Sequence, residues 1–256
     1  MPSQEEIDYY NNIIDQGKDK VDLITVTYNR LNLTKKCLNY INLFTKHPYR
    51  LTVVDNGSKD GTDNYLIELK LNHYIDNLIL LDDNYGLDYA RGTATRHLKG
   101  EYCVFFDNDL LAPDLNPDWL TQELELFKKY PEFGAIALRP QVIVGVNEAE
   151  IFNATDAEIA PNQHCGATFL MFKTDLIKEV GWANEFTNRV SDWRLGDLLK
   201  AKNLKMGWTR NLYCYHMYQD DNWGYPQEVR HFHHPIYPPP SSYERKVNPQ
   251  TLKPID

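Results

Sequence analysis

Residues 101–109 read Glu-Tyr-Cys-Val-Phe-Phe-Asp-Asn-Asp, an apolar stretch that ends in two carboxylates. The run from Tyr102 to Asp107 has the length and the aromatic and β-branched character of a buried strand. Alternate side chains of a strand point to the same face, so Asp107 and Asp109 would face the same way at its carboxyl end. Open α/β sheets bind ligands at that end. Two carboxylates there can share one hard cation, which indicates a metal-bound diphosphate.

Three other apolar runs also end in polar clusters. The clusters are Tyr28-Asn29-Arg30 after residues 21–27, Asn56 to Thr62 after residues 50–55, and Asp82 to Gly86 after residues 77–81. In a parallel sheet these ends lie along one edge, so the polar side chains would converge there. Turn formation alone explains Gly57 and Gly61. It does not explain why Asp55 and Asp107 directly end strongly apolar strands.

The strand-like runs alternate with amphipathic stretches, which predicts an α/β fold. Helical spacing is clear in two stretches, Cys37, Leu38, Ile41 and Phe44, and Trp119, Leu120, Leu124 and Phe127. Alternating strands and helices predict a mostly parallel sheet with helices on both faces. Further strand candidates lie at residues 135–144, 168–172 and 212–217, where the connections are longer and the pattern is harder to assign.

Composition narrows the class of protein. The 256 residues carry 36 acidic and 27 basic side chains, a net charge of −9, and show no basic stripe, which disfavours extended contact with nucleic acid. No apolar run reaches the ~18 residues of a membrane span. The acidic, polar N-terminus is not a secretory signal, so we expect a cytoplasmic protein. The four cysteines lie far apart without metal-binding spacing, which predicts buried thiols.

Taken together, these motifs resemble the family-2 glycosyltransferases, which have the GT-A fold. The matching segments are Val26-Thr27-Tyr28-Asn29-Arg30, Val53 to Thr62, Asn84-Tyr85-Gly86 with Ala90-Arg91, and Phe105 to Asp109. They occur in the family's order and at similar spacing, and the resemblance covers about residues 21–217. Each motif alone is weak, but together they are specific.

The resemblance implies a donor site at the sheet edge. Thr27, Tyr28 and Asp55 would hold the nucleotide base, with Asp55 accepting the imide N–H of uracil. The other donor-binding residues it implies are Arg30, Asn84, Gly86, Arg91, Asp107 and Asn108. Asp109 would ligate Mn²⁺ or Mg²⁺, and Asp107 would contact either the ribose or the metal. Carboxylate and phosphate oxygens suit such hard divalent cations.

The resemblance also assigns roles in the second half of the chain. Gly166, in the segment from His164 to Leu170, would let the backbone approach the donor sugar. Asp192 would be the catalytic base. His216 follows 24 residues later, at the position of a metal-binding histidine, and Asn203 replaces an intervening glycine.

Two features of this half depart from the family pattern. Ser191 and Arg194 stand where the family commonly has acidic residues. Asp197 is therefore a rival base, on a different helical face from Asp192. Asp192 would otherwise be a carboxylate at a helix N-terminus, and His216 an ordinary buried histidine.

The predicted function is a metal-dependent, inverting transfer of a sugar from a UDP-sugar to a hydroxyl group. The acceptor would be a glycan or a lipid-linked glycan, or else a hydroxylated nucleobase in phage-type DNA. A sugar nucleotidyltransferase would need a glycine-rich loop after the first strand, and Tyr28 to Leu31 contains no glycine. A non-catalytic sugar-nucleotide-binding module remains the other alternative.

We expect a single domain with two functional halves. Residues 21–110 would form the nucleotide-sugar-binding half, and residues 111–219 the acceptor-binding and catalytic half. Residues 1–20 would be an N-terminal extension. Residues 220–256, which include three consecutive prolines at 238–240, would form an extended arm or lid.

Overall fold

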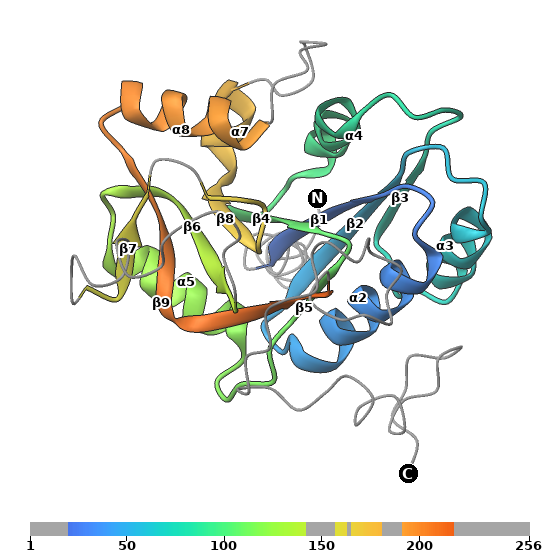
Figure 1. Ribbon diagram of the computed structural model, residues 1–256, viewed down its shortest axis with the longest axis horizontal. Helices are drawn as coiled ribbons and strands as arrows, with labels where there is room; N and C mark the ends of the chain where they lie inside the picture. Colours follow the sequence, from blue (N-terminus) through green and yellow to red (C-terminus); the bar gives the residue numbers. More distant parts are fainter. Residues whose placement is uncertain (1–19, 142–156, 163–164, 181–190, 218–256) are drawn as a thin grey trace, which may run out of the picture.

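The computed structural model describes residues 20–141, 157–162, 165–180 and 191–217, and its central element is one twisted sheet (Figure 1). The first four strands are β1 (Val21–Thr27), β2 (Tyr49–Asp55), β3 (Asn77–Leu80) and β4 (Tyr102–Asp107). They lie in the order β3-β2-β1-β4, and every neighbouring pair is parallel. This part of the sheet has the predicted arrangement.

The sheet continues past β4 with strands of mixed direction. These strands are β5 (Leu110–Leu111), β6 (Phe133–Pro140), β7 (Ile159–Pro161), β8 (Leu170–Lys173) and β9 (Lys205–His216). β8 lies between β4 and β6 and runs antiparallel to both, which breaks the parallel order. β6 and β9 are parallel, whereas β5 and β7 run against β9. The α/β prediction is confirmed, but the mostly parallel pairing holds only in the first half.

Helices cover both faces of the sheet (Figure 1). One face carries α2 (Leu31–Phe44), α3 (Thr62–Leu71) and α5 (Trp119–Lys129), whose apolar sides join one buried cluster. The other carries α4 (Leu87–Ala94), α7 (Thr174–Val180) and α8 (Ser191–Ala201), which join a second. Side chains of β4 alternate between the two clusters, with Val104 and Phe106 in the first and Cys103 and Phe105 in the second. This alternation follows from the two-residue repeat of a strand.

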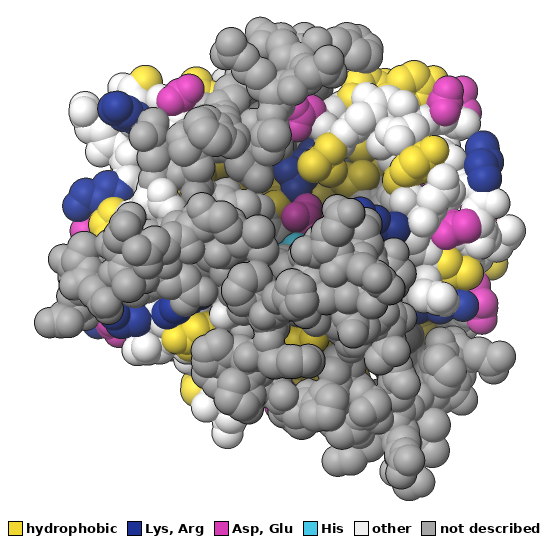
Figure 2. Space-filling view, viewed as in Figure 1, with side chains coloured by type: hydrophobic (Ala, Val, Ile, Leu, Met, Phe, Trp, Pro, Cys, Tyr) yellow, Lys and Arg dark blue, Asp and Glu magenta, His cyan; other side chains and the backbone are white. Residues whose placement is uncertain are grey.

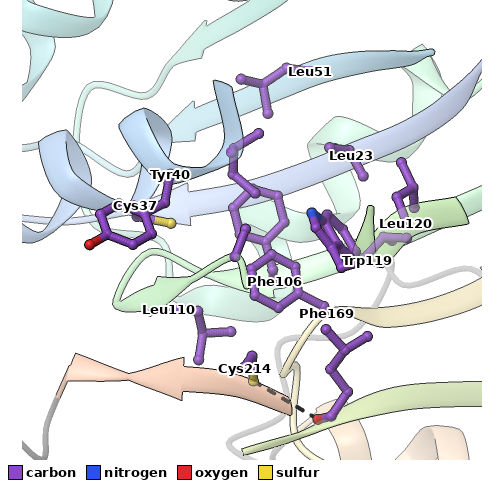
Figure 3. Packing of buried hydrophobic residues seen from close by; sticks show 14 of the residues in the cluster. Leu23, Cys37, Tyr40, Leu51, Phe106, Leu110, Trp119, Leu120, Phe169 and Cys214 are labelled. Carbon is purple, nitrogen blue, oxygen red and sulfur yellow. Dashed lines mark hydrogen bonds between the residues drawn. The ribbon is translucent and has the colours of Figure 1, made fainter. Parts of the chain in front are cut away.

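Aromatic packing fixes the position of β4, the strand that ends at Asp107 and leads into the turn with Asp109 (Figure 3). The Phe106 ring stacks on Phe169 at 5.2 Å, and Trp119 lies 4.6 Å from the same Phe169 ring. Phe169 has a φ of 54°, a left-handed conformation that is uncommon for a bulky residue. Close packing therefore holds the segment before β8 in a strained backbone conformation.

All four cysteines are buried thiols, as predicted, and none of them forms a disulfide bond. Burial raises the pKa of the Cys37 and Cys214 thiols, so both stay protonated. They are thus part of the apolar core. Across the described ranges, no helix is long and apolar enough to cross a membrane.

The amino-terminal edge of the sheet is closed by a buried ion pair. Arg50 on β2 donates to Oδ1 of Asp22 on β1. The other oxygen of Asp22 accepts the backbone N–H groups of Lys99 and Gly100, at 2.6 and 2.7 Å. A Cβ atom at Gly100 would lie 2.1 Å from the carbonyl oxygen of Lys20, so only glycine fits there. This network joins β1 to the chain entering β4.

Candidate active site

The carboxyl ends of β1, β2, β3 and β4 meet at one edge of the sheet, as the sequence predicts. Thr27 lies opposite Asp55 in the β1–β2 register, and Val26 lies opposite Asp107 in the β1–β4 register. Asp55 is also level with Leu80 of β3. The polar segments that follow these strands are therefore neighbours. Figure 2 shows acidic, basic and histidine side chains gathered near the middle of the visible face.

The turn after β2 is organised by Asp55. Ser58 donates its hydroxyl to Oδ1 of Asp55 at 2.5 Å and its backbone N–H to Oδ2 at 3.0 Å. Burial raises the pKa of Asp55, and the bonds from Ser58 partly offset that rise. The Ser58 hydroxyl oxygen also accepts the N–H of Asn29, and Asn29 accepts the N–H of Lys59. The loops after β1 and β2 are thereby tied together.

Thr27 and Asn108, both predicted to bind the donor, are turned into the protein. The hydroxyl groups of Thr27 and Thr34 lie 2.7 Å apart, and Asn108 Nδ2 donates to each at 3.0 Å. All three side chains are buried. Any nucleotide contact of Thr27 or Asn108 would have to come from the backbone. Their side chains instead hold the β4–β5 turn against α2.

The loops after β2 and β3 also contact each other. Asn56 donates to the side chain of Asn84 at 2.8 Å and accepts the backbone N–H of Tyr85 at 3.0 Å. Asn84 in turn accepts the N–H of Gly86, whose φ of 87° favours glycine. The predicted residues Asn84 and Gly86 thus shape the entrance to α4. The aromatic ring of Tyr28, another predicted donor contact, is exposed on the β1 loop.

Asp107 is paired with Arg91 of α4. Arg91 Nη2 donates to Asp107 Oδ1 at 2.8 Å. The Arg91 side chain is only 4% exposed, whereas that of Asp107 is 39% exposed. A buried guanidinium therefore holds the more accessible of the two carboxylates.

Asp109 brings together residues from distant parts of the chain. Arg30 Nη1 donates to its Oδ2 at 2.9 Å, and His216 Nε2 lies 3.7 Å from its Oδ1. Strand pairing explains the approach, because Leu110 of β5 is opposite His216 of β9 and the N–H of Met217 donates to the Asp109 carbonyl at 2.8 Å. Burial lowers the pKa of His216, and the nearby Asp109 offsets part of that change. A neutral imidazole is the form that binds metals.

The side chains of Asp109 and His216 suit a divalent cation. A carboxylate oxygen and an imidazole nitrogen are both ligands for Mn²⁺, and here they face each other. Asp107, the third predicted ligand, carries Arg91. Within the described residues, no three histidine, cysteine or acidic side chains form a ready-made metal cluster. The described residues thus offer two facing ligands, and further ones would come from elsewhere in the chain, from the donor or from solvent.

The segment around Gly166 lies against the same edge. The Ala167 carbonyl accepts the N–H of Asp107 at 3.1 Å, and the Thr168 hydroxyl donates to the Leu138 carbonyl at 2.9 Å. A Cβ atom at Gly166 would meet no atom of the described residues within 4 Å, so none of these neighbours requires glycine there. A donor sugar that lies close to the Gly166 backbone, as predicted, would explain why glycine is present at this position.

The two candidate bases lie on α8. Asp192 is the second residue of this helix, and its side chain lies outside the described part of the structure. Asp197 is exposed further along the same helix. The predicted arm, residues 220–256, and all but the last residue of the predicted extension, residues 1–20, are also outside the described ranges.

Residues that organise the loops were missing from the predicted site. Ser58 and Asn56 follow Asp55 in a turn-forming sequence, so the signal for a side-chain-stabilised turn was present. Thr34 had a weaker signal, a polar residue on a helix that otherwise buries apolar side chains. None of these three residues was predicted as a site residue. Each bonds to other protein groups and shapes the loops, and the prediction considered only residues that would contact the ligand or the metal.

Comparison with known proteins identifies the family. The model of glycosyl transferase family 2 matches residues 22–181. Glycosyltransferase GlyA of Streptococcus pneumoniae is 32% identical over 120 residues, a match that covers 46% of this chain and 16% of GlyA. The chain thus spans only about a sixth of the length of that relative.

Two solved structures share the fold at lower sequence identity. TarS 1–349 of S. aureus, in complex with UDP-GlcNAc, has a TM-score of 0.60 at 17% identity, covering 77% of this chain and 58% of that one. Mannosyltransferase PcManGT of Pyrobaculum calidifontis, in complex with GDP-Man and Mn²⁺, has a TM-score of 0.63 at 20% identity, covering 85% and 66%. Since the family match alone covers more than half of the sequence, the chain belongs to glycosyl transferase family 2.

Proposed function

We propose that this protein is a metal-dependent, inverting glycosyltransferase that moves a sugar from a UDP-sugar to a hydroxyl acceptor. The observation that carries the proposal is the meeting of Asp109 and His216, 3.7 Å apart, at the sheet edge where Asp55 and Asp107 also end their strands. A purely structural histidine would not need to face a carboxylate at this edge. Membership of the family supports the same reaction class.

The donor would lie across the carboxyl ends of β1, β2 and β4. Ser58 bonds to both carboxylate oxygens of Asp55 and so fixes the orientation of this side chain. A remaining lone pair of the carboxylate would accept the imide N–H of a uracil base. Arg91 and Arg30 place two positive charges beside Asp107 and Asp109, where a diphosphate would need them. TarS in complex with UDP-GlcNAc and PcManGT in complex with GDP-Man support a nucleotide-sugar in this fold.

Asp109 and His216 would hold the divalent cation, with Asp107 close by. When bound, such an ion acts as a Lewis acid and neutralises charge on the leaving diphosphate. Here the chain's own part is to keep the His216 imidazole neutral through burial and to fix Asp109 through its backbone bond to Met217. The complex of PcManGT with Mn²⁺ supports this ion as the first to test.

Asp192 would act as the general base. Its carboxylate would take the proton of the acceptor hydroxyl while that oxygen bonds to the anomeric carbon. The bond from this carbon to the diphosphate oxygen breaks on the opposite face, so the configuration inverts. The position of Asp192 in the first turn of α8 supports an ionised carboxylate, because the N-terminus of a helix favours negative charge. Asp197, exposed on the same helix, is the alternative.

A glycan or a lipid-linked glycan is the proposed acceptor. The net charge of −9 argues against the second candidate, a hydroxylated base in DNA, because a nucleic-acid substrate favours a basic surface. Both acceptor classes offer a hydroxyl group to the same base.

A donor screen followed by product analysis tests the proposal. Thermal unfolding of the full chain would be measured with UDP- and GDP-sugars, each with and without MnCl₂. We expect stabilisation by a UDP-sugar that needs the metal, and mass spectrometry should then detect sugar added to a glycan or to hydroxymethylated DNA. Tight UDP binding without hydrolysis or transfer from any donor would instead favour a non-catalytic binding module.

A further inference from the structure

Asp109 already has a cationic partner, and that partner is accessible from solvent. Arg30 Nη1 lies 2.9 Å from Asp109 Oδ2, and the Arg30 side chain is 45% exposed while that of Asp109 is 7% exposed. The His216 imidazole faces the other oxygen, Oδ1, at 3.7 Å. The guanidinium therefore approaches the carboxylate from the outside, beside the position where a cation would bridge Asp109 and His216.

Two cations cannot share this carboxylate at low cost. A divalent ion bound to Asp109 and His216 would lie within a few ångströms of the Arg30 guanidinium, in a partly buried region where charges repel more strongly than in water. The repulsion is relieved if Arg30 turns away when the ion enters. Because the Arg30 guanidinium and the ion are both cations drawn to the same carboxylate, the binding of one opposes the binding of the other.

The backbone at Arg30 is held by contacts that do not involve its side chain. Arg30 precedes α2, its carbonyl accepts the N–H of Thr34 at 2.9 Å, and Asp60 accepts the N–H of Leu31 at 3.0 Å. Arg91 is different, since its side chain is only 4% exposed on Asp107. Of these two arginines, Arg30 is therefore the exchangeable one.

We propose that Arg30 is the cation that holds Asp109 in the donor-free protein, and that it releases this carboxylate when the metal enters beside it together with a nucleoside diphosphate. The diphosphate supplies the anion to which the guanidinium turns, and planar guanidinium groups bind phosphate oxygens well. This inference rests on the proposed function and adds to it a coupling between metal binding and diphosphate binding. The metal binds weakly alone and more tightly once the diphosphate has drawn Arg30 from Asp109, and by linkage the metal strengthens diphosphate binding equally.

Titration calorimetry of the wild type and two variants tests this role. MnCl₂ would be titrated into the wild type, Arg30→Gln and Lys59→Gln, each with and without saturating UDP. Lys59→Gln is a matched control because it also removes one positive charge from these loops, and the exposed Lys59 ammonium group contacts the Asp82 carbonyl. Mn²⁺ alone should bind Arg30→Gln about tenfold more tightly than the wild type. The gain in Mn²⁺ affinity caused by UDP should shrink in this variant and stay at its wild-type size in Lys59→Gln.

Different results would overturn different parts of the inference. If Arg30→Gln and Lys59→Gln strengthen Mn²⁺ binding equally, general charge rather than competition at Asp109 is the cause. If Arg30→Gln leaves Mn²⁺ affinity unchanged while the wild type shows strong coupling to UDP, the role of Arg30 is wrong and the proposed function stands. If wild-type UDP binding is the same with and without Mn²⁺, the metal dependence itself fails, and the role of Arg30 fails with it.

Discussion

The two edges of the parallel half of the sheet each carry a carboxylate paired with an arginine, yet the pairs differ in how closed they are. At the amino edge, the side chains of Asp22 and Arg50 are 2% and 10% exposed, and Asp22 accepts two further backbone N–H groups. At the carboxyl edge, Asp109 is nearly as buried, but its partner Arg30 is 45% exposed. The closed pair has no room for another ligand. The open pair has a cation that solvent and ligands can replace.

The largest effect should come from breaking the closed pair. Asp22→Asn leaves the Arg50 charge buried without its counter-ion, which typically costs about 3–5 kcal/mol. Unfolding in guanidinium chloride would measure this loss in the free energy of unfolding. The double variant Asp22→Asn, Arg50→Met should recover part of it, because no uncompensated charge remains. A stability loss below about 1 kcal/mol in the single variant would show that the two edges do not differ in this way.

The matching change at the carboxyl edge should affect binding more than stability. Asp109→Asn removes the charge that a metal needs, so we expect at least about a 100-fold loss of metal-dependent UDP affinity, equivalent to ~2.7 kcal/mol. The free energy of unfolding should change by less than about 1 kcal/mol, since the Arg30 partner is half exposed. Titration calorimetry gives the UDP affinity, and denaturant unfolding of the same preparation gives the free energy of unfolding. Unchanged UDP affinity would show that Asp109 does not bind the metal.

A smaller effect should follow from loosening the turn that carries Asp109. Asn108→Ala removes the donor shared by the buried hydroxyl groups of Thr27 and Thr34. Loss of such a buried bond costs about 1–2 kcal/mol, and UDP affinity should fall by a few fold because Asp109 is then held less firmly. Thr121→Ala, which removes a partly buried side-chain bond from α5 to Asp118, the residue before that helix, is the control for stability loss alone. Equal UDP affinity in both variants would argue against a positioning role for Asn108.

The sequence predicted the parallel half of the sheet better than the rest. β1 and β4 begin and end at the predicted residues, because each is a mostly apolar, β-branched or aromatic run that is followed by polar residues. β9 was predicted as residues 212–217 but spans Lys205–His216. Its middle contains Arg210 and Asn211, and its pairing with β6, β7 and β5 overrides that local polarity. Long-range pairing of this kind leaves little local signal.

The candidate site, like the sheet, was predicted where local sequence patterns determine it and was missed where distant residues do. The convergence of Asp55 and Asp107 followed from strand ends alone. The approach of His216 to Asp109 came from sequence register and family resemblance. The Arg30–Asp109 and Arg91–Asp107 pairs were not predicted, because they depend on how long side chains turn in three dimensions. Local patterns thus indicated which residues gather, and only the structure shows which of them are paired.

Another buried carboxyl group, at Glu123, shows what burial does when no described arginine lies beside the carboxyl group. Glu123 of α5 is fully buried, and neither of its carboxyl oxygens has a hydrogen-bond partner among the described residues. Burial raises its pKa well above the ordinary value of 4.5, so the folded protein keeps the proton that the unfolded chain loses. The wild type should therefore lose stability as pH rises above about 4.5, by at most ~1.4 kcal/mol per pH unit, until the folded pKa is passed.

Glu123→Gln should flatten that dependence, because the amide does not titrate, and the variant should become the more stable protein at neutral pH. Urea unfolding from pH 4 to pH 8 would measure the slope, with the exposed Glu125→Gln as the matched control on the same helix. A slope that survives in Glu123→Gln would mean that another group causes it. A slope that disappears would show that burial without a partner makes a carboxyl neutral, whereas the buried carboxylates of Asp22 and Asp109 each have an arginine beside them.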